Sequence, residues 1–120
     1  MKKILVVEDE PEYRELAERV LGQAGYRVLS AGTGQEGLKA FRDESPDLVL
    51  LDVMLPDMVG FDICRRIRED RSRADTPVLF CTVRSAVSSL AEGLKAGSTD
   101  YVIKPFVPKD LLERVRAALK

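Results

Sequence analysis

Charged and hydroxyl side chains follow four short apolar runs in the sequence. Glu8 and Asp9 follow ILVV, Asp52 follows LVLL, Thr82 follows VLFC and Lys104 follows YVI. A carboxylate does not fit inside a strand that is buried on both faces, so Asp52 is expected at the carboxyl end of its strand, where open α/β sheets bind ligands. The five side chains are therefore expected at one edge of one sheet. Three acids, a hydroxyl and an ammonium group suit a phosphoryl group carried on a carboxylate beside a divalent cation.

Apolar runs of four or five residues alternate along the chain with longer segments of helical periodicity. This alternation is typical of βα units around a parallel sheet, so the predicted fold class is α/β. Five strands are expected near residues 3–7, 27–30, 48–51, 78–81 and 100–103. Five helices are also expected. Four of them begin at Pro11, after Thr33, after the turn that ends at Gly60, and at Pro108. The remaining helix precedes the fifth strand and contains Val87, Leu90, Ala91 and Leu94.

The composition fits a single domain of 120 residues, of which 45% are hydrophobic and can fill one core. The 19 basic and 20 acidic residues nearly cancel and form no long block, so no nucleic-acid footprint is visible. The start MKKILVVEDE lacks the apolar stretch of a signal peptide and no run approaches a membrane span, so we expect a soluble, cytoplasmic protein.

Cys64 and Cys81 are expected to be packing residues in a reducing compartment.

The three acids also predict a metal site. Glu8, Asp9 and Asp52 would place up to three negative charges close together, which is unfavourable unless a cation neutralises them. The chain contains no histidine, so any metal must be held by oxygen atoms, and Mg²⁺ suits such ligands better than zinc does. An alternative is that these acids cap the following helices. Three acids at the ends of two strands, with Lys104 opposite, favour the metal site.

Asp52 is the candidate nucleophile, because a carboxylate can accept a phosphoryl group to form an aspartyl phosphate. Thr82 could donate a hydrogen bond to a phosphoryl oxygen, and Lys104 could pair with the charge of the carboxylate or the phosphate. Taken alone, Thr82 would be an ordinary residue at a strand end and Lys104 a solvated loop charge. Their joint position with Asp52 favours roles in phosphoryl chemistry.

The sequence resembles the receiver domain of two-component response regulators over its full length, residues 1–120. The motifs that carry the resemblance are ILVVEDE at the first strand, LVLLDVMLPDMVG around the third, Thr82 after the fourth and DYVIKPF at the fifth. The resemblance implies a flavodoxin-like, doubly wound parallel sheet of order 2-1-3-4-5, flanked by five helices. It also implies a phospho-accepting signalling switch rather than an enzyme, one that assists its own phosphorylation and dephosphorylation.

The resemblance further implies a donor and a set of metal ligands. By resemblance, Asp52 accepts the phosphoryl group from the phosphohistidine of a sensor histidine kinase. Asp9, Asp52 and the backbone carbonyl of Met54 would hold Mg²⁺, and Glu8 would reach the metal through water. Neither direct nucleic-acid binding by this domain nor a membrane partner is expected.

Thr82 and Tyr101 resemble the family's switch pair. In the family this pair relays phosphorylation to the face formed by the fourth helix, the fifth strand and the fifth helix. An alternative for Tyr101 is a tyrosine that packs at the sheet edge. The bond between Lys104 and Pro105 matches a peptide bond that is cis in the family.

A surface for self-association is also implied by the resemblance. Asp100, Asp110 and Arg114 match positions that form intermolecular ion pairs in DNA-binding regulators that dimerise through this face. Leu90 stands where a basic residue is expected. We expect a weak homodimer that strengthens when Asp52 is phosphorylated, because losing one exposed ion pair costs little. The alternative is an ordinary solvated face, with Leu90 widening the buried stripe of its helix.

The sequence departs from the family at a few positions, and other interpretations stay open. Val83 stands where the family usually carries Ala or Gly, and its branched side chain is expected to restrict approach to the site. Met54 and Arg84 occupy variable positions that tune dephosphorylation. A haloacid-dehalogenase-like magnesium phosphatase would need a second Asp where Met54 stands. A flavodoxin-like cofactor binder would need a Gly-rich phosphate loop, and a receiver-like module that takes no phosphate would not need the intact acids.

Overall fold

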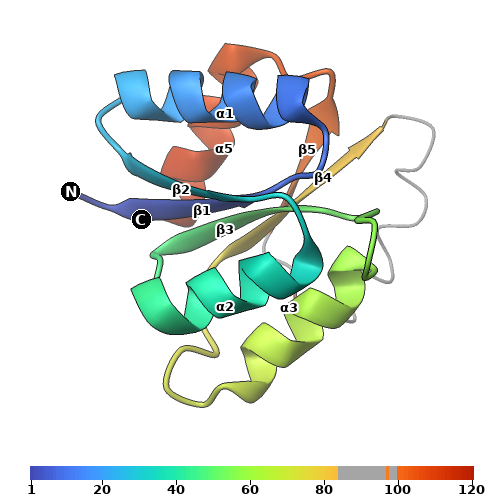
Figure 1. The fold of residues 1–120 in the computed structure, drawn as a ribbon. Coiled ribbons are helices and arrows are strands. Elements are labelled where there is room, and N and C mark those ends of the chain that lie inside the picture. The colour runs from blue at the N-terminus through green and yellow to red at the C-terminus, as the bar shows by residue number, and fades with distance from the viewer. Residues whose placement is uncertain (84–96, 98–99) are drawn as a thin grey trace.

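The sheet has the architecture that the sequence predicts. The computed structural model describes residues 1–83, 97 and 100–120. Five parallel strands form one sheet in the order β2-β1-β3-β4-β5 (Figure 1). The strands are β1 (Lys3–Val7), β2 (Arg27–Ala31), β3 (Leu48–Asp52), β4 (Val78–Val83) and β5 (Asp100–Lys104). The predicted doubly wound order is therefore confirmed.

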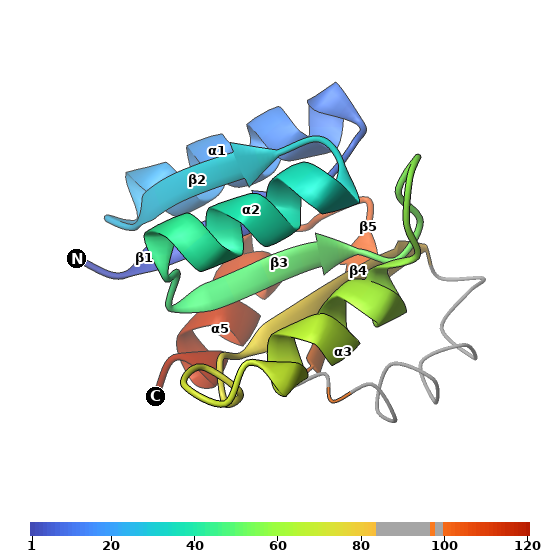
Figure 2. The same cartoon turned by 60° about the horizontal axis from the view of Figure 1, so that its bottom comes forward.

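Helices cover both faces of this sheet. The described helices are α1 (Pro11–Gln23), α2 (Gly34–Glu44), α3 (Gly60–Glu69) and α5 (Pro108–Ala118). Helices α1 and α5 lie on one face, and α2 and α3 lie on the other (Figures 1 and 2). Prolines stand at the first turn of α1 and of α5, where their missing N–H leaves no hydrogen bond unmade. The predicted helix that holds Val87, Leu90, Ala91 and Leu94 lies outside the described residues.

Alternation along the central strands builds two hydrophobic clusters, one on each face of the sheet. In β1, Leu5 and Val7 join the cluster under α2 and α3, whereas Ile4 and Val6 join the cluster under α1 and α5. Cys64 packs in the first cluster and Cys81 in the second, so both are packing residues, as predicted. Burial raises the pKa of both thiols. In the part of the chain that the structure describes, no helix is long and apolar enough to cross a membrane.

Four strands end one or two residues later than the sequence predicts. Strands β2, β3, β4 and β5 end at Ala31, Asp52, Val83 and Lys104. The reason is that backbone pairing extends beyond the apolar runs from which the strands were predicted: Asp52 pairs with Cys81, and Val83 pairs with Lys104. The polar side chains at this edge are therefore carried by the strands themselves, which hold them more rigidly than loops would.

Candidate functional site

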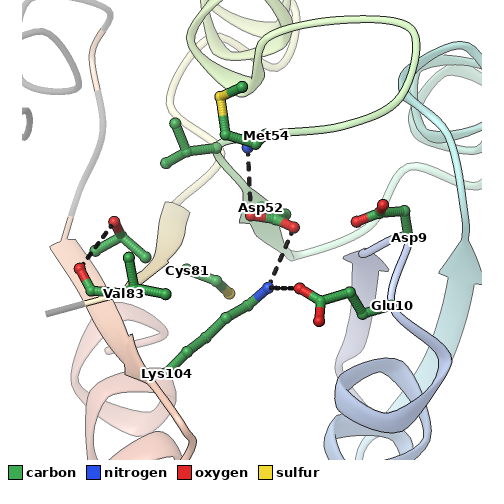
Figure 3. Close-up of a pocket in the computed structure, with 9 residues that line it drawn as sticks. Asp9, Glu10, Asp52, Met54, Cys81, Val83 and Lys104 are labelled. Carbon is green, nitrogen blue, oxygen red and sulfur yellow. Dashed lines mark hydrogen bonds and ion pairs between the residues drawn. The ribbon is translucent and has the colours of Figure 1, made fainter. Parts of the chain in front are cut away.

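A pocket of about 350 Å³ opens at the carboxyl ends of the central strands (Figure 3). It is lined by five of the six residues predicted for phosphoryl and metal chemistry, namely Asp9, Asp52, Met54, Thr82 and Lys104, and by Val83. Glu10 lines it as well, although the sequence analysis did not select this residue. Glu8 is not part of the pocket wall. It is buried next to the pocket, where it contacts the ammonium group of Lys104.

The Lys104 ammonium group lies at the centre of the charged network. Its Nζ atom is 2.6 Å from Glu8 Oε1, 3.2 Å from Asp52 Oδ2 and 3.2 Å from Glu10 Oε1. It also lies 4.6 Å from the centre of the Tyr13 ring. Burial alone would lower the pKa of Lys104, but the neighbouring carboxylates outweigh it and raise that pKa above its usual value. Lys104 is therefore a fixed positive charge in the site.

Glu8 is held in a single orientation by its surroundings. Its residue exposure is only 2%, and its Oε2 atom accepts a hydrogen bond of 3.1 Å from the Glu10 backbone N–H. Burial raises the pKa of Glu8 to about 7, while the neighbouring Lys104 ammonium group works in the opposite direction. The Arg14 guanidinium donates to the Glu8 carbonyl at 2.9 Å and so fixes the backbone at this turn.

Four carboxylates converge at the pocket and make a donor set suited to a hard cation. Glu8, Asp9, Glu10 and Asp52 each offer an oxygen atom, and these atoms lie within 4.8 Å of one another. Oxygen ligands without imidazole suit Mg²⁺, so the residues present fit the predicted metal. The signal that could have identified Glu10 is its place in the run Glu8-Asp9-Glu10 at the end of β1.

The loop that follows β3 is pinned next to the pocket by hydrogen bonds. The Met54 backbone N–H donates to Asp52 Oδ1 at 3.3 Å. Asp57 accepts from the first two backbone N–H groups of α2, at 2.7 and 3.0 Å, which also lowers the pKa of Asp57. Gly60 is required at the end of the loop, because a Cβ atom there would lie 2.3 Å from the Asp52 carbonyl oxygen. Asp57 and Gly60 are supporting residues that the sequence analysis missed.

The two predicted switch residues lie on neighbouring strands and the same face of the sheet. Thr82 is opposite Ile103, and Tyr101 is opposite Phe80, which is two residues from Thr82. Thr82 is buried, whereas Tyr101 is half-buried and packs against the cluster under α2 and α3. The guanidinium of Arg114 lies 4.9 Å from the centre of the Tyr101 ring.

Other predicted features fall on β4, β5 and α5. Val83 lines the pocket and is 49% exposed. The peptide bond between Lys104 and Pro105 is cis, as predicted. Arg84 and Leu90 lie outside the described residues.

The charges expected at a dimer surface form ion pairs within one chain. Arg114 contacts Asp100 at 3.0 Å and Asp110 at 3.2 Å. All three side chains are partly exposed. Self-association through these charges stays a prediction.

The fold and the pocket define a class: a doubly wound α/β domain with an oxygen-rich acidic site at the carboxyl edge of its sheet. The family described as "Response regulator receiver domain" matches residues 4–116, and the chain belongs to this family. It is 43% identical over 119 residues to the DNA-binding response regulator MtrA of Mycolicibacterium smegmatis, covering 99% of this chain and 51% of the relative. It is 41% identical over 121 residues to the transcriptional regulatory protein AfsQ1 of Streptomyces coelicolor, covering 100% of this chain and 52% of the relative.

Solved structures agree with this assignment. The chemotaxis response regulator CheY4 of Vibrio cholerae aligns with a TM-score of 0.94 and 32% identity, covering 99% of each chain. The BeF3-activated receiver domain of DrrB aligns with a TM-score of 0.87 and 42% identity, covering 99% of this chain and 97% of that one. The chain spans about half the length of the curated relatives that it matches.

Proposed function

We propose that this chain is the phospho-accepting switch of a two-component system and that Asp52 is the residue that accepts the phosphoryl group. The observation that carries the proposal is the position of Asp52 at the end of β3, in the pocket wall and in contact with Lys104. Family membership supports the same conclusion, because receiver domains are signalling regulators. Among the acids near the pocket, Asp52 is the one that lies within a strand, since β1 ends at Val7, before Glu8 and Asp9.

The phosphodonor in this proposal is the phosphohistidine of a sensor histidine kinase. A carboxylate oxygen of Asp52 attacks phosphorus, the new O–P bond forms, and the P–N bond breaks with its electron pair left on the imidazole nitrogen. The Lys104 ammonium neutralises charge on the carboxylate and on the transferred group. The Thr82 hydroxyl donates a hydrogen bond to a phosphoryl oxygen. Both residues lie at strand ends, so their side chains are already held close to the site before the transfer.

Magnesium belongs to the proposal as the cation of the acidic pocket. Asp9, Asp52 and the Met54 backbone carbonyl would hold it, and Glu8 would reach it through water. When bound, Mg²⁺ supplies positive charge that offsets the repulsion between the carboxylates and an incoming phosphoryl group. The convergence of four carboxylates within 4.8 Å supports this assignment.

The output of the switch is proposed from the relatives. We infer that Thr82 and Tyr101 relay phosphorylation to the surface that they underlie, where a homodimer would form through the predicted fourth helix, β5 and α5. Residues 1–120 would be one receiver unit that works in the cytoplasm. The relatives named as DNA-binding or transcriptional regulators are about twice as long as this chain. A whole protein of that kind would contact DNA through a further domain, since the charge balance of this one shows no nucleic-acid surface.

The proposal is tested with a small phosphodonor. Wild-type protein, Asp52→Asn and the control Asp75→Asn are incubated with acetyl phosphate and Mg²⁺, and intact mass is measured. Asp75 is exposed and precedes β4, at the opposite edge of the sheet. Wild type and Asp75→Asn should gain one phosphoryl group, and Asp52→Asn should gain none. Equal modification of all three would refute the assignment of Asp52.

A further inference from the structure

The Glu10 side chain makes a contact that the proposed function does not use. Glu10 is the residue that precedes α1, yet its side chain does not cap the helix. It extends across the pocket instead, and its Oε1 atom accepts a hydrogen bond of 3.2 Å from Lys104 Nζ (Figure 3). The two residues are 94 positions apart in the chain. This contact therefore joins the start of α1 to the end of β5 through the site.

Of the three carboxylates around Lys104, Glu10 is the one that another group can displace most easily. An ammonium group has three N–H donors, and Lys104 has three carboxylate neighbours. The side chain of Glu10 is 57% exposed, whereas those of Glu8 and Asp52 are 3% and 9% exposed. Water can take over the hydrogen bonds of Glu10 but not those of the two buried acids. A phosphoryl oxygen that needs a donor from Lys104 would therefore displace Glu10.

The charge of Glu10 also opposes the incoming group. Glu10 lines the same pocket as Asp52, so its carboxylate faces the space that a phosphoryl group would enter. The Glu10 carboxylate and a phosphoryl group in the same pocket repel each other, because both are negatively charged. Partial exposure to water weakens this repulsion without removing it. Both effects favour the unphosphorylated state.

We propose that Glu10 is a positioning residue that holds Lys104 in the unphosphorylated protein and slows phosphoryl transfer to Asp52. The inference rests on the proposed function, because it requires Asp52 to be the acceptor. Release of Glu10 into solvent accompanies phosphorylation and leaves one Lys104 donor for a phosphoryl oxygen. In the transfer from acetyl phosphate, the O–P bond to Asp52 forms, the bond from phosphorus to the acetate oxygen breaks, and acetate leaves with the electron pair.

The test compares Glu10→Gln with Glu12→Gln, which removes the same charge from an exposed position in the first turn of α1 outside the pocket. With acetyl phosphate and Mg²⁺, Glu10→Gln should be modified about two- to five-fold faster than wild type, the range expected for one partly exposed charge interaction. The gain should shrink in about 1 M salt, where the screening length falls to about 3 Å. It should also be smaller with phosphoramidate, which carries less negative charge.

A measurement without metal or donor gives an independent readout. The NMR signal of the Lys104 Nζ atom should shift in Glu10→Gln and stay unchanged in Glu12→Gln, because only Glu10 contacts that ammonium group. If wild type is modified at Asp52 and Glu10→Gln reacts at the wild-type rate with both donors, the role of Glu10 is refuted and the proposed function stands. If wild type accepts no phosphoryl group, the proposed function fails and this inference fails with it.

Discussion

Replacing Glu8 by Gln should make the stability of the metal-free protein less dependent on pH. In the folded protein burial raises the pKa of Glu8 from 4.5 to about 7. In the unfolded chain this carboxyl group returns to its ordinary value, so the folded state binds the proton more tightly. The stability that comes from this proton is fully present below the unfolded pKa and is lost as the pH rises through about 7. Gln resembles the protonated form of Glu8, so the variant keeps this contribution to stability at high pH.

The size of the effect follows from the two pKa values. Each pKa unit corresponds to about 1.4 kcal/mol, so a rise from 4.5 to about 7 predicts a loss of roughly 3 kcal/mol between acidic and alkaline pH. Glu8 is only 2% exposed, so solvent screens little of this effect. A difference of this size is a large part of the stability of a domain.

Urea unfolding followed by circular dichroism measures the difference. Wild type, Glu8→Gln and Glu15→Gln are unfolded in the presence of a chelator at about pH 4, below the unfolded pKa of Glu8, and at about pH 8, above its folded pKa. Glu15 is an exposed acid of α1 and serves as the control. Between the two pH values, wild type and Glu15→Gln should each lose about 3 kcal/mol more than Glu8→Gln. The same pH dependence in all three proteins would show that burial does not disfavour the charged form of Glu8.

Three further substitutions test other parts of the site. Asp9→Ala should weaken Mg²⁺ binding in calorimetry and block phosphorylation, and normal Mg²⁺ binding would place the metal elsewhere. Asp57→Ala should lower the free energy of unfolding in urea, since Asp57 accepts hydrogen bonds from the first two backbone N–H groups of α2. An unchanged unfolding free energy would show that this cap contributes nothing. Val83→Ala should speed phosphorylation or dephosphorylation with small donors, because Val83 narrows the pocket. Identical rates in both directions would show that Val83 does not hinder access.

The strands and most of the pocket were predictable from local sequence patterns, whereas the strand order came from the resemblance to receiver domains. Apolar runs that end in polar residues mark the carboxyl ends of parallel strands, so Asp52, Thr82 and Lys104 could be assigned to one edge without coordinates. The exact strand ends were not predictable in this way. Backbone pairing does not depend on side-chain hydrophobicity, and Asp52 therefore still pairs with Cys81 beyond the apolar run of β3.

The missed residues act through contacts between distant parts of the chain. Glu10 meets Lys104 across 94 positions, and Asp57 meets Gly34 across 23. Neither contact has a periodic signal in the sequence, because each depends on where a loop meets the end of a strand or helix after the sheet has formed.

The residue that carries the phosphoryl group decides whether Asp52 is the acceptor. After reaction with acetyl phosphate and Mg²⁺, borohydride reduces an aspartyl phosphate to homoserine, and peptide mass spectrometry then locates the converted residue. We predict homoserine at position 52 and at no other acid of the pocket. Conversion at Asp9 or Glu10, with position 52 unchanged, would contradict the account.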